Sequence, residues 1–162
     1  MEKYCSIIKS PIGEVTIIAD ELAVNEITFG RKDVEGLAAN QWSESAAAQL
    51  SEYFEGKLKD FSFPMAQKGT DFQQQVWTAL LDVNYGDTTS YLKFSHQLNN
   101  PLAIGAIAAA NGKNNLAIVA PCHRVIGSSG KLVGYAGELW RKKWLLEHEQ
   151  EVAQKGQTTL KF

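Results

Sequence analysis

The sequence is poor in cysteine and has no long apolar run. It holds two cysteines, Cys5 and Cys122, among 162 residues. This argues against a disulfide framework and favours free thiols in a reducing compartment. No apolar run approaches the roughly 20 residues that cross a bilayer, and residues 1–5 lack the apolar core of a signal peptide. We therefore expect a cytoplasmic protein that does not bind membranes.

The chain also lacks a strong charge of either sign, since its net charge is −2. This argues against strong non-specific binding of nucleic acid by the chain as a whole. The charge is nevertheless uneven: residues 1–68 hold 7 Lys and Arg against 11 Asp and Glu, whereas residues 69–162 hold 9 against 7. The more basic part carries Cys122, which indicates weakly that a polyanion binds there.

The first part of the chain has the pattern of a small α+β domain. Three short β-branched or aromatic runs are separated by turn residues at 10–13 and 20–21, and the runs lie at 7–8, 15–18 and 27–29. Residues 43–55 change to helical spacing, with an apolar face of Ala47, Leu50, Tyr53 and Phe54. Phe61–Phe63 has the composition of one more strand. We place this domain at residues 1–66, with a linker near Met65–Gly69.

The second part is mostly helical, beginning with a strong helix-start signal. Thr70 and Gln73 form the pattern of a capping box, in which two side chains satisfy N–H groups at a helix start. An apolar stripe at helical spacing follows, made of Phe72, Val76, Trp77, Leu80 and Leu81. We expect this helix to end at Tyr85–Asp87.

Two further short helices are predicted over about 90–98 and from Pro101 to Asn111. Asn100 is placed as the N-cap of the second, and Pro101 as its first helical residue. Because a tight turn joins them, the pair resembles a helix-turn-helix. A last amphipathic helix is expected over about 138–149. The second domain then covers residues 70–150, and 151–162 form a polar tail.

The strongest chemical signal lies in the seventeen residues from Pro121 to Gly137. Cys122 stands between a proline and His123, and a glycine-rich loop that includes Tyr135 follows. A thiolate is the reactive form of cysteine, and a nearby imidazole is a common means of forming it. Glycines let the backbone approach a flat ligand closely. The segment therefore predicts a nucleophilic thiol in a small pocket, whereas Cys5 has no such neighbours and is expected to be structural.

His123 needs help to act on Cys122, because adjacent side chains diverge in an extended segment. A bridging water molecule can relay the proton, and a carboxylate can hold the imidazole in the useful tautomer. The last helix offers three carboxylates for this role, and spacing alone leaves the choice open among Glu138, Glu147 and Glu149.

The predicted helix over 101–112 is unusual because no Lys, Arg, Asp or Glu occurs from Phe94 to Gly112. One hypothesis is a buried core helix. The other is a helix kept thin and neutral so that it enters a nucleic-acid groove. The sequence leaves both open.

Three segments in this order resemble the O6-methylguanine-DNA methyltransferases: Pro121–Val125, Tyr135–Gly137 and Trp144–Glu149. The resemblance covers about residues 70–150 well and the N-terminal strands loosely. It implies an α+β protein, in which a ribonuclease H-like α/β domain precedes a mostly helical domain with a winged helix-turn-helix-like motif. It also implies direct DNA repair, in which one alkyl group moves irreversibly from O6-alkylguanine to a cysteine, with one turnover per molecule.

The same resemblance implies how the reaction is carried out. Cys122 matches the alkyl acceptor, His123 the water-linked base and Glu149 the carboxylate behind it. Asn114 matches an asparagine that braces the active-site turn, and Tyr91 a tyrosine that crowds the target phosphate and protonates the leaving guanine. No cofactor and no metal are implied. The partner is alkylated duplex DNA, bound through the minor groove by a monomer, and whether O4-alkylthymine is also repaired stays open.

A further group of residues is expected to hold the base or the DNA. The carbonyl of Val125 matches the group that reads the guanine amino group. Tyr135 and Ala136 match a lip over the base, where a backbone N–H reaches O6. The remaining expected DNA contacts are Ile104, Gly105, Ala106, Ala109 and Arg124.

Gly105 departs from the family pattern at an important place. The family carries an arginine there, which fills the gap left by the flipped base, and glycine cannot do so. Glycine also weakens a helix by about 0.5–1 kcal/mol relative to alanine. We therefore expect weaker base flipping or weaker duplex binding, with Ile104 as an apolar wedge in its place.

Two other functions compete with this hypothesis. A protein of the same fold that binds the lesion without transferring the alkyl group is favoured slightly by Gly105, but such binders lack the cysteine. An unrelated thiol hydrolase built on Cys122 and His123 needs a distant histidine and an oxyanion hole, and it would turn over repeatedly.

Overall fold

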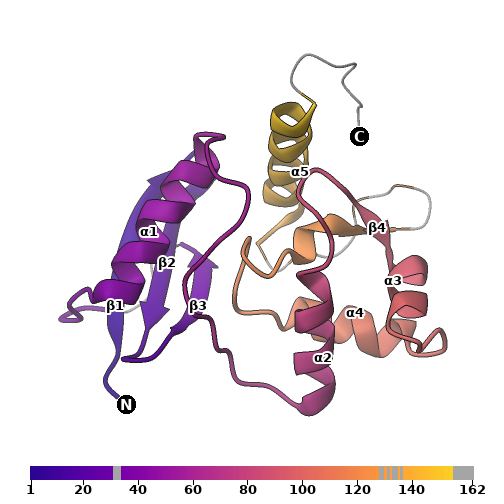
Figure 1. Ribbon diagram of the computed structural model, residues 1–162, viewed down its shortest axis with the longest axis horizontal. Helices are drawn as coiled ribbons and strands as arrows, with labels where there is room; N and C mark the ends of the chain where they lie inside the picture. The colour runs from indigo at the N-terminus through magenta and orange to yellow at the C-terminus, as the bar shows by residue number, and fades with distance from the viewer. Residues whose placement is uncertain (31–33, 128–129, 131, 133–134, 136, 155–162) are drawn as a thin grey trace. The chain divides into compact units, whose positions relative to one another are not determined.

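The computed structural model describes residues 1–30, 34–127, 130, 132, 135 and 137–154. The chain divides into two compact units, which are Met1–Lys68 with Asn115–Val119, and Gly69–Asn114 with the residues from Ala120 onward (Figure 1). The mixed α+β organisation in two parts agrees with the sequence analysis. From the sequence, however, Asn115–Val119 is expected in the second part, whereas the structure groups this segment with the first.

The first unit is a three-stranded antiparallel sheet with one helix across a face (Figure 1). Its strands follow chain order and are β1 (Tyr4–Ser10), β2 (Gly13–Ala19) and β3 (Val24–Phe29). The alternate residues Val15, Ile17 and Ala19 of β2 are buried on one face, and Thr16 is buried on the other, in the central strand of the sheet. The strands and the two turns predicted from the sequence are confirmed.

Helix α1 (Gln41–Phe54) covers the sheet and begins at a capping box between Asn40 and Ser43. Its buried residues are Ser43, Ala46, Leu50 and Tyr53, so the face is turned slightly from the predicted one. Ala46 takes the buried position that the sequence pattern gives to Ala47, because the buried residues follow one another at intervals of three and four from Ser43.

The predicted strand over Phe61–Phe63 is wrong. The segment instead packs its aromatic rings, with Phe61 5.8 Å from the ring of Tyr53 and 5.9 Å from that of Phe63. Pro64 follows and has no N–H to give to a ladder. Its carbonyl accepts from the Val24 N–H, and the neighbouring Met65 forms a single parallel bridge to Val24.

The second unit contains four helices and one short parallel strand pair among its described residues. The elements are α2 (Asp71–Leu80), β4 (Thr89–Ser90), α3 (Tyr91–Gln97), α4 (Ile104–Gly112), a 3₁₀ turn over Cys122–Arg124, β5 (Val125–Ile126) and α5 (Leu139–Ala153). The capping box at Thr70 and Gln73 is confirmed. No described helix of either unit is long and apolar enough to cross a membrane.

Three helix boundaries differ from the sequence analysis. Helix α2 ends at Leu80, and α4 begins at Ile104 with no side-chain cap, so Asn100 and Pro101 precede the helix. Asn99 explains the late start of α4, because its positive φ of 55° ends α3 and leaves Pro101 in a turn before the next helix. Helix α5 continues to Ala153 and therefore includes the start of the predicted tail.

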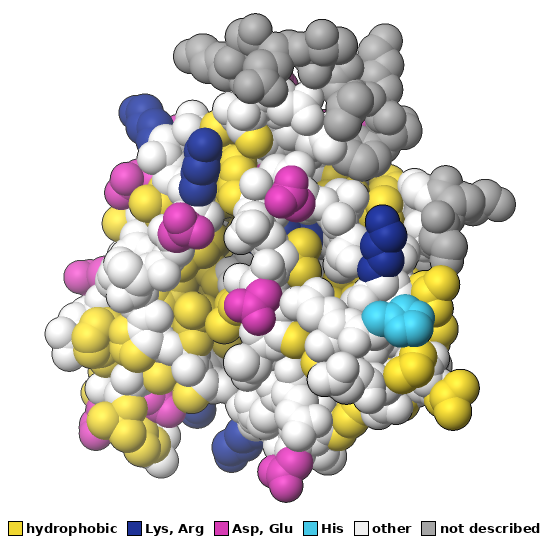
Figure 2. Space-filling model, turned by 45° about the vertical axis from the view of Figure 1, so that its right-hand side comes forward, with side chains coloured by type: hydrophobic (Ala, Val, Ile, Leu, Met, Phe, Trp, Pro, Cys, Tyr) yellow, Lys and Arg dark blue, Asp and Glu magenta, His cyan; other side chains and the backbone are white. Residues whose placement is uncertain are grey.

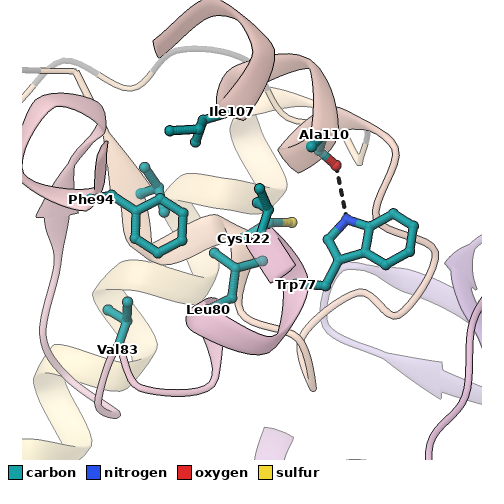
Figure 3. Packing of buried hydrophobic residues seen from close by; sticks show 9 residues of the cluster. Trp77, Leu80, Val83, Phe94, Ile107, Ala110 and Cys122 are labelled. Atoms are coloured by element: carbon teal, nitrogen blue, oxygen red, sulfur yellow. Dashed lines mark hydrogen bonds between the residues drawn. The ribbon is translucent and has the colours of Figure 1, made fainter. Parts of the chain in front are cut away.

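The core of the second unit surrounds Cys122 (Figure 3). Buried side chains from α2, α3 and α4 meet there, and Trp77 donates from its indole nitrogen to the Ala110 carbonyl at 2.9 Å. Strand β4 pairs with β5 through Thr89 and Val125. This pairing sets the start of α3, where Tyr91 lies, beside the segment that carries the cysteine.

The turn after α2 approaches α5 closely. Gly86 has a φ of +84°, and a Cβ at this residue would lie 2.7 Å from the Cβ of Ala153. Only glycine fits this conformation and this space without strain. The turn consequently lies against the face of α5 that carries Glu149.

Candidate active site

Cys122 is almost fully buried, with 6% of its surface exposed, in the apolar cluster of the second unit. Burial raises the pKa of the thiol, because a thiolate is costly in apolar surroundings. A hydrogen bond with Asn114 and the charge of Lys142 oppose that rise. The thiol is therefore held protonated unless a base takes its proton.

Three side chains form a buried polar cluster behind the thiol. His123 Nε2 lies 2.7 Å from Glu149 Oε2, and Arg124 donates to both oxygens of the same carboxylate at 2.8 and 3.1 Å. Burial alone would raise the pKa of Glu149, but His123 and Arg124 outweigh it and hold that pKa well below its usual range. Glu149 is thus a permanent anion in the interior. Glu138 and Glu147, the other two candidates from the sequence, are exposed.

The cluster determines which nitrogen of His123 can act as a base. Burial lowers the pKa of the ring, although Glu149 opposes this, so the ring is neutral at pH 7. Because the Glu149 carboxylate can only accept, Nε2 carries the hydrogen that it donates. Nδ1 is then the acceptor nitrogen, and it is buried with no hydrogen-bond partner among the described residues.

Arg124 does not lie where the sequence analysis puts it. The sequence places it among the DNA contacts, but it is 6% exposed. Its guanidinium binds the Glu149 carboxylate and donates to the Val83 carbonyl at 2.6 Å. It also lies over the ring of Tyr85 at 5.7 Å. The positive charge of Arg124 therefore stabilises the buried carboxylate of Glu149 and does not face DNA.

Lys142 is a residue that the sequence analysis missed. It is fully buried, and its Nζ donates to the Val125 carbonyl at 2.7 Å. Burial lowers its pKa to about 8, while Cys122 acts in the opposite direction. A signal was available, because Lys142 and Glu149 share the buried stripe of α5 with Leu145 and Leu146. Two charged residues on an apolar stripe indicate a buried polar site.

Asn114 ties the end of the α4 segment to the chain before the cysteine. Its Nδ2 donates to the Ala120 carbonyl at 2.7 Å. Tyr91 lies at the start of α3, half-buried, and its hydroxyl oxygen accepts from Asn111 Nδ2 at 3.3 Å. Burial raises the pKa of Tyr91, and the bond from Asn111 acts against that rise. The structure therefore brings Asn114 and Tyr91 into the neighbourhood of the thiol.

The expected lip over the base is described only in part. Tyr135 packs against the cluster that contains Cys122, and burial raises the pKa of its hydroxyl well above 10. Ala136 lies outside the described residues. The Val125 carbonyl is occupied by Lys142, but a carbonyl oxygen has two lone pairs and accepts a second donor.

The two sides of helix α4 differ, so that one has the character of a buried core helix and the other that of a thin, neutral helix. Ile107, Ala110 and Asn111 are buried, whereas the opposite side is exposed and carries Ile104, Gly105, Ala106 and Ala109. A Cβ added at Gly105 would meet no atom within 4 Å. Figure 2 brings the side of α3 and α4 forward and shows hydrophobic side chains exposed on it. One side of the helix belongs to the core, and the other is a neutral surface whose residues are small apart from Ile104.

The rate of alkylation of Cys122 is expected to stay level as pH falls to 6.5, the ordinary pKa of histidine, and to decline only below it. The reason is that burial holds the pKa of His123 below 6.5. Stability should also fall below that pH, because the unfolded chain then binds a proton that the buried ring does not. Single-turnover alkylation rates from about pH 5 to 9 test this. A midpoint at or above 6.5 would contradict it.

The comparisons with protein families match almost the whole chain. Residues 3–67 match the ribonuclease-like domain of 6-O-methylguanine DNA methyltransferase, and residues 71–151 match its DNA binding domain. A methylated-DNA–protein-cysteine methyltransferase of Methanosarcina barkeri is 43% identical over 155 residues, which are 91% of this chain and 97% of the relative. The protein of that name from Mycobacterium bovis is 41% identical and covers 90% and 92%.

Solved structures give the same result. The crystal structure of O6-methylguanine methyltransferase from Mycobacterium tuberculosis superposes with a TM-score of 0.84 at 38% identity, covering 95% of this chain and 96% of that one. A structure of the Mycobacterium tuberculosis protein in complex with DNA gives a TM-score of 0.84 at 40% identity, covering 92% and 94%.

Proposed function

Because the chain belongs to the 6-O-methylguanine DNA methyltransferase family, we propose that it repairs DNA by taking an alkyl group from guanine O6 onto Cys122. The relatives at about 40% identity are named methylated-DNA–protein-cysteine methyltransferases. The observation that carries the proposal for this chain is the buried cluster behind Cys122, in which a neutral His123 is held by an ionised Glu149.

The chemistry follows from the protonation states in that cluster. The thiol proton of Cys122 passes through a water molecule to Nδ1 of His123, and Glu149 stabilises the imidazolium that forms. The sulfur then attacks the carbon bound to guanine O6. The S–C bond forms while the C–O bond breaks, and the electron pair of that bond stays on the guanine. The thioether formed at Cys122 is stable and the free thiol is not regenerated, so each molecule reacts once.

The leaving guanine needs a proton, and Tyr91 is our candidate donor. Its hydroxyl proton moves to a ring nitrogen of the base, which then departs neutral. The phenolate and the imidazolium afterwards regain neutrality by proton exchange through solvent. The Val125 carbonyl, held by Lys142, reads the guanine amino group, and the backbone N–H of Ala136 is our candidate for the donor at O6.

We propose that DNA meets the exposed side of α4. A relative has been crystallised with DNA, and the exposed residues of α4 are uncharged and, apart from Ile104, small. Such a surface fits the narrow minor groove, with Ile104 as the wedge. In this proposal α3 and α4 act as the helix-turn-helix, and the protein binds as a monomer.

The alternatives from the sequence are less well supported. A lesion-binding protein without transfer is not favoured, since the relatives at about 40% identity are named as transferases. A thiol hydrolase would turn over its substrate repeatedly, whereas the same relatives are named as methyltransferases that act on a protein cysteine.

Intact-protein mass spectrometry after incubation with a duplex that contains one O6-methylguanine tests the function. We expect a gain of one CH₂, mapped to the peptide that contains Cys122, and none in Cys122→Ser. A gain with free O6-benzylguanine but none with the duplex would leave the thiol chemistry intact and overturn the proposed DNA binding. No gain with either substrate would overturn the proposed function.

A further inference from the structure

Asn111 occupies the buried end of α4, between two groups that the proposed reaction uses. It is 5% exposed. Its Nδ2 lies 3.3 Å from the hydroxyl oxygen of Tyr91 and 3.5 Å from the carbonyl oxygen of Cys122. One amide group therefore reaches both the candidate proton donor and the backbone of the nucleophile.

The orientation of this amide follows from its partners. The carbonyl of Cys122 can only accept a hydrogen bond, so the NH₂ end of Asn111 must face it. The second N–H then points to the oxygen of Tyr91, which acts as acceptor. The hydroxyl hydrogen of Tyr91 is consequently not used toward Asn111 and stays available for another acceptor.

We propose that Asn111 is a positioning residue for alkyl transfer, which holds the oxygen of Tyr91 and the carbonyl of Cys122 through one amide and so presents the phenol proton to the leaving guanine. This inference rests on the proposed function and deepens it. The amide also stabilises the phenolate that remains after the proton has moved, because a donor on the phenol oxygen favours its charged form.

Two further observations support the role. The Ala110 carbonyl, next to Asn111, accepts from the indole of Trp77 at 2.9 Å, which fixes the last turn of α4 against α2. The Oδ1 atom of Asn111 is buried with no partner among the described residues. An unpaired buried acceptor lowers stability, so its retention beside the thiol is better explained by the site than by the fold.

The test compares two alkylations of the same thiol, read by mass spectrometry of the Cys122 peptide. Transfer from O6-benzylguanine needs a protonated leaving base, whereas alkylation by iodoacetamide releases iodide and needs no proton. Asn111→Leu should slow benzyl transfer about tenfold or more, yet leave the iodoacetamide rate within about twofold of wild type. Equal slowing of both reactions, or of neither, would overturn the proposal.

A second comparison uses Tyr91. In a Tyr91→Phe background the proton donor is already lost, so Asn111→Leu should add little further slowing. Asn111→Asp should also slow benzyl transfer, because a carboxylate at this place accepts the phenol proton and turns it away from the base. If the slowing in the Tyr91→Phe, Asn111→Leu double variant equalled the product of the slowing in the two single variants, the proposal would be contradicted. If the wild-type protein itself failed to accept the benzyl group, the proposed function would fail first, so the two failures are distinguishable.

Discussion

Glu149→Gln is expected to lower the free energy of unfolding by about 3–5 kcal/mol and the rate of alkyl transfer by about 100-fold or more. The stability loss arises because Arg124 keeps its positive charge while it loses the carboxylate that binds it at 2.8 and 3.1 Å. A glutamine also brings two N–H donors to a place where His123 and Arg124 already donate, so at least one donor loses its acceptor.

The rate loss has a separate cause in the histidine. Without an anion beside Nε2, the imidazolium that forms as Cys122 loses its proton is no longer stabilised. The ring also loses the partner that sets its tautomer, so Nδ1 no longer stands as the obligatory acceptor. Benzyl transfer under single-turnover conditions measures this effect, and thermal or denaturant unfolding measures the first.

Two further variants separate stability from catalysis. Glu147→Gln removes a carboxylate from the same helix at an exposed site, where the ion pair with Lys143 is 3.8 Å long, and should change neither quantity noticeably. Adding Arg124→Leu to Glu149→Gln removes the uncompensated charge and should restore much of the stability while the rate stays low. A double variant that recovered both would show that the rate loss came from unfolding alone.

The sequence identifies the reacting residues of the site more completely than the residues that hold them in place. Cys122 and His123 stand out because they are adjacent and precede a glycine loop. Spacing could not select Glu149 from three glutamates, since the choice depends on how α5 is rotated against the 3₁₀ turn. The same rotation of α5 buries Lys142. This burial can be recognised in the sequence only once the apolar stripe of α5 is counted from Leu145.

The same distinction applies to the fold: elements set by neighbouring residues are predictable from the sequence, and features set by distant contacts are not. Capping residues at Thr70 and turn residues in the first sheet act locally, so those elements were predicted correctly. The end of α3 depends on the positive φ of Asn99, and the grouping of Leu116 with the first sheet depends on a bridge to Ile27. Contacts between residues distant in the sequence decide such features, and no short pattern records them.

Gly105→Arg is expected to tighten binding to a duplex that contains O6-methylguanine about tenfold, and to raise the rate of duplex repair with it. In the proposed complex an arginine fills the gap left by the flipped base. An aromatic side chain stacked on a base contributes about 1–3 kcal/mol, and a contribution from arginine near the lower end of that range, about 1.4 kcal/mol, is a factor of ten. The side chain has room, since Gly105 is exposed and no atom lies within 4 Å of its Cβ position. The rate with free O6-benzylguanine should not change, because no base is flipped there.

Two matched variants show which property of the arginine matters. Gly105→Ala should stabilise α4 by about 0.5–1 kcal/mol without filling the gap, so improved repair by alanine would point to helix stability. Gly112→Arg adds the same charge at the other end of the same helix, also with no atom within 4 Å of its Cβ. A gain through phosphate contact alone would appear in both arginine variants and fade as salt rises. A gain confined to Gly105→Arg and retained at higher salt would mean that this chain flips its target base with a weakened helix, and that Ile104 replaces the missing side chain only in part.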